Sequence, residues 1–243
     1  MKPPYVTITL LLINVAVFLY QLAHPAFDMG WSMIPAEITT GTDLVGTHYI
    51  GEQILQQPID HVAGPTPIYL TLLSSMFMHG GWMHLGGNML YLWIFGDNVE
   101  HRFGSVRFLV FYLASGLLAS VTQIFLGPDS IIPNLGASGA ISGILGAYLV
   151  LFPRNKVNVI FFFRMISVPA IVVLGMWIAL QLFQGYGTMQ NAGESGGVAY
   201  GAHIGGFVAG VVFGLLARMT MSGEPETAFK RQYDADPKVK RYW

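Results

Sequence analysis

The charged residues of this chain leave six long gaps. Asp, Glu, Lys and Arg are absent from the windows 3–27, 61–96, 108–128, 130–153, 165–193 and 195–217. A helix that crosses a bilayer needs about 20 mostly apolar residues, and every one of these windows is longer than that. We therefore predict an all-α membrane protein with six spanning helices, at about 5–23, 82–99, 106–126, 136–152, 166–184 and 198–217.

The composition excludes several other classes of protein. Only 10% of the 243 residues are charged, whereas soluble domains average about 25%, and the apolar content excludes a disordered chain. A net charge of −1 offers no cationic field to phosphates, so we expect no nucleic-acid partner. The absence of cysteine excludes disulfides, cysteine-ligated metals and thiol catalysis.

The window 61–96 is long enough for more than one helix. Gly80-Gly81 divides it, and the stretch 69–78 before the break holds only ten residues. That length is typical of an interfacial or re-entrant segment rather than a span.

The basic residues predict the orientation. With six spans, all 12 Lys and Arg fall on one side of the membrane: Lys2, Arg102, Arg107, Arg154, Lys156, Arg164, Arg218, Lys230, Arg231, Lys238, Lys240 and Arg241. Lys and Arg mark cytoplasmic loops, so both termini should be cytoplasmic. We expect a membrane domain over 1–221, in which the first span is retained, and a disordered polar tail over 222–243.

The segment 24–66 should then lie on the opposite, outer side. At about 43 residues it exceeds an ordinary connection, so we expect short interfacial structure in it.

Four polar side chains fall at similar depths in the predicted spans. His84 and Asn88 lie near the outer start of the second span, and Ser138 near that of the fourth. His203 lies roughly 8 Å below the outer start of the sixth span. Polar groups inside a membrane are costly, and they indicate a functional site.

A serine and a histidine are the minimum for nucleophilic acyl transfer, because the hydroxyl needs a base as it attacks. The nearest carboxylates, Asp97 and Glu100, lie at the inner end of the second span, roughly 15–20 Å away by helix rise. We therefore predict a dyad of Ser138 and His203 with no acidic third member.

The start of a helix can also stabilise an oxyanion. The N–H groups of Ala137 and Ser138 lie in the first turn, where they have no partner within the helix and where the dipole is positive. His84 and Asn88 are four residues apart on one helix face, so both can donate to the same oxygen. These residues are our predicted oxyanion hole.

Each of these residues also has a purely structural explanation. Ser138 can be a helix N-cap, His203 a buried histidine bonded to a carbonyl, and Asn88 a hydrogen bond between helices. Glycines at four-residue spacing, such as Gly139 and Gly143, indicate close helix packing whatever the function. A metal site at His79 and His84 is disfavoured by their spacing of five. The convergence at one depth favours the catalytic interpretation.

Four motifs now resemble the rhomboid family of intramembrane serine proteases, over about residues 69–217. HGGWMHLGGN at 79–88 resembles the entry to the family's second span, and Phe95-Gly96 with Val99-Glu100 resembles the end of that span. Gly136-Ala137-Ser138-Gly139 is similar to the GxSG nucleophile motif, and AHIG at 202–205 to the AHxxG of the sixth span.

The resemblance implies a six-helix bundle with a water-filled active site open to the outer face. It implies Ser138 as nucleophile, His203 as general base, and His84, Asn88 and the Ser138 N–H as the oxyanion site. His79 would be a structural support. The implied substrates are single-span membrane proteins, cut in or near the span, and no metal, ATP or organic cofactor is implied.

Two positions depart from the family. Many members have a tyrosine four residues after the nucleophile, packed on the catalytic histidine, and here that residue is Ser142. Many also have a Trp-Arg pair in the first outer loop, where this chain has Leu70-Thr71. Either another group holds the His203 ring, or the orientation of the ring is looser.

Two other functions compete with an endopeptidase. A catalytically silent rhomboid-like scaffold that binds membrane clients is disfavoured because the serine and the histidine are both present. A transporter or channel is disfavoured by the lack of intramembrane carboxylates and of inverted repeats. The short N-terminus favours a prokaryotic plasma membrane as the host membrane, and we make no prediction of oligomeric state.

Overall fold

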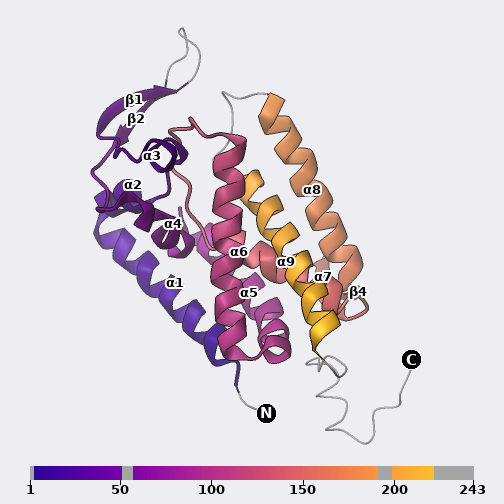
Figure 1. Ribbon diagram of the computed structural model, residues 1–243. Coiled ribbons are helices and arrows are strands. Elements are labelled where there is room, and N and C mark those ends of the chain that lie inside the picture. The colour runs from indigo at the N-terminus through magenta and orange to yellow at the C-terminus, as the bar shows by residue number, and fades with distance from the viewer. Residues whose placement is uncertain (1–2, 51–56, 191–198, 222–243) are drawn as a thin grey trace, which may run out of the picture.

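Six long helices form a bundle in the described part of the chain, which comprises residues 3–50, 57–190 and 199–221 of a computed structural model. They lie within a few residues of the six predicted spans (Figure 1). Their bounds are α1 (Tyr5–Ala23), α5 (Trp82–Phe103), α6 (Ser105–Leu126), α7 (Ser138–Leu151), α8 (Ala170–Gln190) and α9 (Tyr200–Thr220). The predicted tail 222–243 lies outside the described residues.

The outer segment and the stretch after it carry short elements, as expected. The outer segment contains α2 (Pro25–Trp31), α3 (Pro35–Thr40), β1 (Gly46–Ile50) and β2 (Gln57–His61). The predicted interfacial or re-entrant stretch consists of the 3-10 turn η1 (Ile68–Leu70), α4 (Thr71–Ser74) and the 3-10 turn η2 (Ser75–Phe77).

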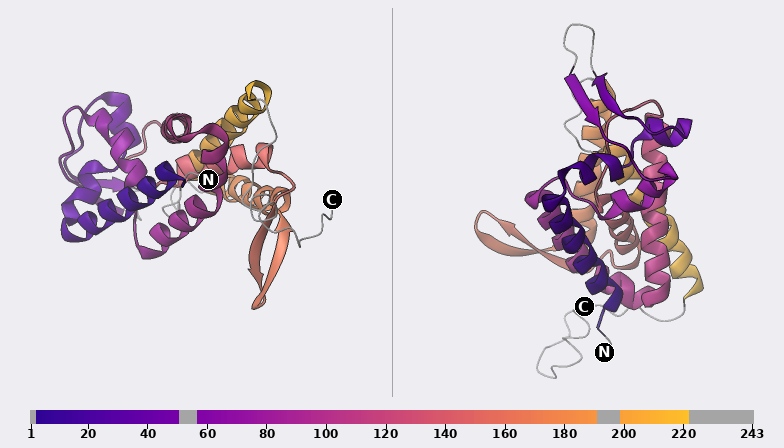
Figure 2. Two further views of the ribbon diagram at one scale, coloured as in Figure 1. Left: turned by 90° about the horizontal axis from the view of Figure 1, so that it is seen from below. Right: turned by 90° about the vertical axis from the view of Figure 1, so that its left-hand side faces the viewer.

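The prediction of an all-α protein is wrong in one respect, because two antiparallel hairpins are present. One is β1–β2, and the other is β3 (Lys156–Phe161) with β4 (Arg164–Pro169), which projects sideways from the bundle (Figure 2). Residues 156–159 alternate polar and apolar, which is the period of a strand, and Val157 points into the core. The fifth long helix therefore begins at Ala170, four residues later than predicted.

Helix α7 is the centre of the bundle. All of its residues from Gly139 to Tyr148 are buried, and α5, α6, α8 and α9 pack around it. A helix that is apolar on every side belongs in an interior. Its 14 residues extend about 21 Å, which is less than the hydrocarbon thickness of a bilayer.

Helices α1, α6 and α9 are long and apolar enough to cross a membrane, judged among the described residues. The chain is thus a mostly helical protein with membrane-spanning segments.

Glycines bring α7 and α9 into backbone contact. A Cβ atom on Gly206 would collide with the carbonyl oxygen of Gly139, and one on Gly210 with that of Gly143. Small residues at this spacing let membrane helices approach closely. The approach fixes the start of α7 against the first turn of α9, where Ser138 and His203 lie.

The buried Glu100 ties three helices together at the opposite end of the bundle. Its carboxylate accepts hydrogen bonds from the Val6 and Thr7 N–H groups, at 3.0 and 2.7 Å, and from the Ser105 hydroxyl at 2.6 Å. The described basic side chains belong to loops and helix ends on this side: Arg102, Arg107, Arg154, Lys156, Arg164 and Arg218.

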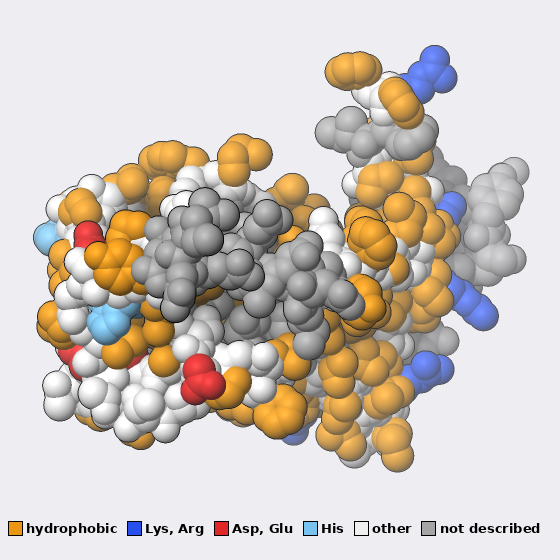
Figure 3. Space-filling view, turned by 90° about the horizontal axis from the view of Figure 1, so that it is seen from above, with side chains coloured by type: hydrophobic (Ala, Val, Ile, Leu, Met, Phe, Trp, Pro, Cys, Tyr) orange, Lys and Arg blue, Asp and Glu red, His pale blue; other side chains and the backbone are white. Residues whose placement is uncertain are grey.

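The end of the bundle that carries α2, α3 and β1–β2 has a different charge. Figure 3 views the molecule from that end, where acidic and histidine side chains are visible and most of the visible Lys and Arg side chains lie toward the right of the view. The asymmetry follows the predicted orientation of the basic residues.

Candidate active site

Ser138 is the first residue of α7. Ala137 is the helix N-cap and provides no side-chain cap. The alternative explanation of Ser138 as the N-cap residue therefore does not apply. Just before it, the Gly136 N–H donates to the Ser75 carbonyl at 2.8 Å, and Gly136 has φ of 138°, a conformation that favours glycine. This turn leads directly into α7, so that the serine lies at the start of the helix.

His203 joins the serine to a third residue. Its Nε2 lies 2.8 Å from Ser138 Oγ, and its Nδ1 lies 2.6 Å from Gln181 Oε1. A carbonyl oxygen only accepts hydrogen bonds, so Nδ1 carries the ring proton and Nε2 can accept the hydroxyl proton of the serine. This is the arrangement that a general base requires.

Gln181 is not among the site residues predicted from the sequence. It is a polar side chain inside the predicted span 166–184, where the criterion that indicates Asn88 also applies to it. The sequence leaves two possibilities for His203, a different group that holds the ring or a looser orientation, and the contact with Gln181 favours the first. The Ser142 hydroxyl instead donates to the Ser138 carbonyl at 2.6 Å, and the Trp177 ring lies 6.0 Å from the imidazole, centroid to centroid.

His84 presents a donor to the space beside the serine. The Gly80 N–H donates to its Nδ1 at 3.3 Å, which leaves the proton on Nε2. A Cβ atom on Gly136 would lie 2.9 Å from His84 Nε2 and 3.4 Å from Ser138 Oγ. Gly136 therefore keeps open the space that lies between the donor and the hydroxyl.

Asn88 lies one turn after His84 on α5. It is only 7% exposed, and its Nδ2 has no hydrogen-bond partner among the described residues. A buried donor without a partner costs about 1–3 kcal/mol. The Asn88 amide nitrogen does not form the hydrogen bond between helices that would explain this residue structurally. It can therefore donate to a ligand.

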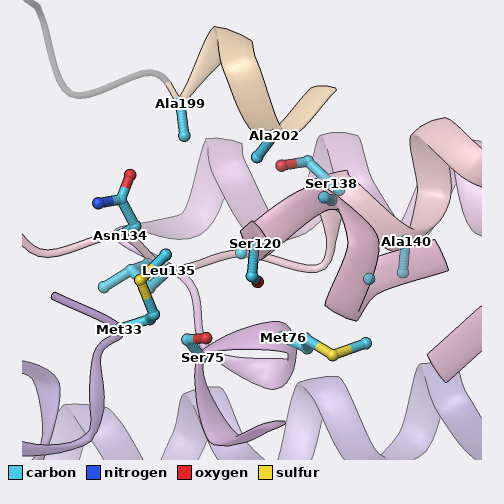
Figure 4. Close-up of a pocket in the computed structure, with 14 residues that line it drawn as sticks. Met33, Ser75, Met76, Ser120, Asn134, Leu135, Ser138, Ala140, Ala199 and Ala202 are labelled. Atoms are coloured by element: carbon cyan, nitrogen blue, oxygen red, sulfur yellow. The ribbon is translucent and has the colours of Figure 1, made fainter. Parts of the chain in front are cut away.

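These residues line one cleft. A cavity of about 490 Å3 is bounded by His84, Asn88, Ser138 and His203, with walls that include Met83, Tyr91, Leu145 and Trp177. A smaller cavity of about 40 Å3 lies on another side of Ser138, next to Ser75, Ser120 and Asn134 (Figure 4). Its size and hydroxyl groups fit a few water molecules.

His79 supports the site from outside it. Its backbone is held by Gln21 of α1, which accepts from its N–H at 2.9 Å and donates to its carbonyl at 3.2 Å. Its buried ring stands edge-on to His84, with centroids 5.2 Å apart. Burial lowers the pKa of His79 to about 4, so the ring is neutral at pH 7.

The carboxylates of α5 lie away from Ser138 and His203 and have other partners. Asp97 pairs with His101 at 2.7 Å, and Glu100 holds the start of α1. Within the described ranges there is no group of three or more side chains suited to a metal ion.

More than half of the chain matches a known protein family. Residues 67–220 match the Rhomboid domain, which is more than half of the chain. The chain belongs to the rhomboid family. The match includes all four motifs and every residue of the site, from His79 to His203.

The relatives of this rhomboid include active and inactive proteins. It is 34% identical over 149 residues to Rhomboid protein 1, mitochondrial, of Saccharomyces cerevisiae, covering 60% of this chain and 41% of that protein. It is 38% identical over 146 residues to Rhomboid protease GluP of Bacillus subtilis, covering 59% and 26%. It is 27% identical over 186 residues to Inactive rhomboid protein 1 of Drosophila melanogaster, covering 76% and 12%. The chain thus spans less than half the length of each of these relatives.

Proposed function

We propose that this rhomboid is an intramembrane serine endopeptidase that hydrolyses peptide bonds in or near the membrane segments of single-span proteins. The observation that carries the proposal is the 2.8 Å contact between Ser138 Oγ and His203 Nε2, with the ring tautomer set by Gln181 at 2.6 Å. A protease of Bacillus subtilis among the relatives supports the reaction class.

In this mechanism Ser138 Oγ attacks the scissile carbonyl carbon as His203 Nε2 takes its proton. The C–O bond forms, and the carbonyl electron pair moves onto oxygen. His203 then gives its proton to the leaving amine as the C–N bond breaks. Water repeats the sequence on the acyl-enzyme, again with His203 as base, and restores the serine.

The oxyanion faces donors from two helices. We assign His84 Nε2–H and Asn88 Nδ2–H from α5, and the N–H groups of Ala137 and Ser138 at the positive end of α7. The free Asn88 nitrogen and the tautomer of His84 support this assignment.

We also propose that all six long helices are embedded in the bilayer, with both termini cytoplasmic and the site in the outer half. The basic residues gathered at one end of the bundle support this orientation. A prokaryotic plasma membrane is our expected host, which the bacterial relative supports, although relatives from mitochondria and plants share the domain.

A silent scaffold is the second candidate, and the inactive Drosophila relative favours it. The two candidates differ in one property, which is whether Ser138 is nucleophilic.

A fluorophosphonate probe tests that property directly. We expect labelling of the detergent-solubilised wild type, and none of Ser138→Ala or His203→Ala. The matched control is Ser142→Ala, which removes another serine one turn along the same helix and should still be labelled. A folded wild type that is not labelled, or a Ser138→Ala protein that is, would contradict the proposal. Cleavage of a single-span reporter by the wild type in proteoliposomes then identifies the reaction.

A further inference from the structure

We infer that Gln181 is the positioning residue that orients the catalytic histidine. The inference rests on the proposed function. It assigns to a neutral amide the task that an acidic residue has in a Ser-His-Asp triad.

The geometry leaves this task to Gln181. Its Oε1 lies 2.6 Å from His203 Nδ1, which is a hydrogen-bond contact. The residue one turn after the nucleophile, Ser142, is bonded to its own helix. Without the hydrogen bond that His203 Nδ1–H donates to Gln181, the ring proton can move to Nε2, or the imidazole can turn away from Ser138 Oγ. In either state the ring cannot act as the base.

An amide suits a site inside a membrane protein. A buried carboxylate is costly unless it is fully paired, whereas a carbonyl oxygen accepts the hydrogen bond from Nδ1–H without burying a charge. The amide therefore selects the same tautomer as a carboxylate would. The amide stabilises the imidazolium that forms in the reaction less than a carboxylate would. A carboxylate variant at this position should therefore change the pH dependence.

The amide stands on a peripheral helix. Many side chains of α8 are exposed, including Met176, Leu180, Leu182 and Phe183. Among the described side chains of its second half, Gly185 packs near Tyr200 of α9, and Gln181 bonds to His203. Trp177, one turn before Gln181, lines the cleft. Helix α8 therefore supplies both a wall of the cleft and the support of the base.

Two substitutions separate orientation from packing. Gln181→Leu removes the acceptor at similar volume, and we expect kcat for a reporter peptide in proteoliposomes to fall roughly tenfold at nearly unchanged KM. Gln181→Glu restores an acceptor and adds charge. We expect it to recover most of kcat at high pH and to move the acid limb of the pH–rate profile upward by about one unit, because the carboxylate stabilises protonated His203.

Other titratable groups facing this ring are His84 across the cleft and Tyr200 on its own helix.

Gln184 provides the matched controls. It is exposed on α8, three residues further on, so Gln184→Leu and Gln184→Glu make the same chemical changes away from the site. We expect both to have the kcat and pH profile of the wild type. A packing role for Gln181 would change stability or KM but would leave the pH profile in place.

The outcomes distinguish this inference from the proposed function. If the wild type cleaves the reporter and Ser138→Ala does not, the function stands. The inference is then overturned if Gln181→Leu and Gln181→Glu behave like the Gln184 controls. If Gln181→Leu fails to fold, the pH profile of Gln181→Glu still decides, since an unshifted acid limb overturns the inference. If the wild type neither cleaves nor takes up the fluorophosphonate, the proposed function itself fails.

Discussion

Helix α9 carries His203 and helix α8 carries its partner Gln181, but the two helices are held in the bundle in different ways. Helix α9 lies against α7 backbone to backbone, because Gly206 and Gly210 leave no room for a side chain between them. Helix α8 has few buried side chains, among them Ala170 and Leu174 in its first turns, and a Cβ atom on its Gly175 would meet nothing within 4 Å.

The difference separates two requirements of the proposed reaction. Ser138 and His203 must stay within hydrogen-bond distance of each other, and they stand on the two helices that cannot shift without breaking backbone contacts. If Gln181 orients the imidazole as inferred above, that orientation depends on a helix with few buried side chains among its described residues. The site would then combine a rigid reacting pair with an adjustable support.

Matched glycine substitutions give the largest expected effect. Gly210→Ala places a methyl group against the Gly143 carbonyl, and we expect it to lower the free energy of unfolding by about 1–3 kcal/mol or more and to abolish cleavage. Gly175→Ala adds the same methyl group to open space in α8, and we expect unchanged or slightly higher stability. Thermal unfolding in detergent and reporter cleavage measure both. Equal effects of the two substitutions would refute the contrast between the helices.

Asn88→Ala should affect the reaction without affecting the fold. Removing one oxyanion donor should lower kcat by roughly 100-fold or less, because the other donors remain. Stability should be unchanged or higher, since Asn88 Nδ2 has no partner to lose. Asn158→Ala, in the hairpin β3–β4, is the control and should be neutral for cleavage. A loss as complete as that of Ser138→Ala would show that Asn88 has another role.

The long helices and the approach of Ser138 to His203 could be predicted because both depend on simple constraints. Gaps between charges locate apolar segments, and a common depth brings Ser138, His203, His84 and Asn88 together. Gaps between charges do not distinguish a helix from a strand, however, so the predicted span 166–184 includes the end of strand β4. Only the alternation at 156–159 separates them. Gln181 was missed because its contact depends on the rotation of α8, which its own sequence does not determine.

Hydrogen exchange compares the two helices without any substitution. In nanodiscs, we expect the amides of residues 170–186 in α8 to exchange at least about tenfold faster than those of α9, because local opening costs less where few contacts are buried. Ser138→Ala should show the same pattern, which separates the effect from catalysis. Equal protection in the two helices would mean that α8 is as firmly placed as α9, and the adjustable support would have to be abandoned.

Ser142→Ala should have the smallest effect, and it is the sharpest test of where the histidine is held. The Ser142 hydroxyl donates to the Ser138 carbonyl rather than to the ring, so its removal should change kcat by no more than about threefold, which corresponds to a neutral hydrogen bond of below about 1 kcal/mol. Steady-state cleavage by Ser142→Ala, measured beside Gln181→Leu, makes the comparison. If Ser142→Ala loses more activity than Gln181→Leu, the imidazole is oriented from α7 and not from α8, and the rigid and adjustable parts of the site have been assigned to the wrong helices.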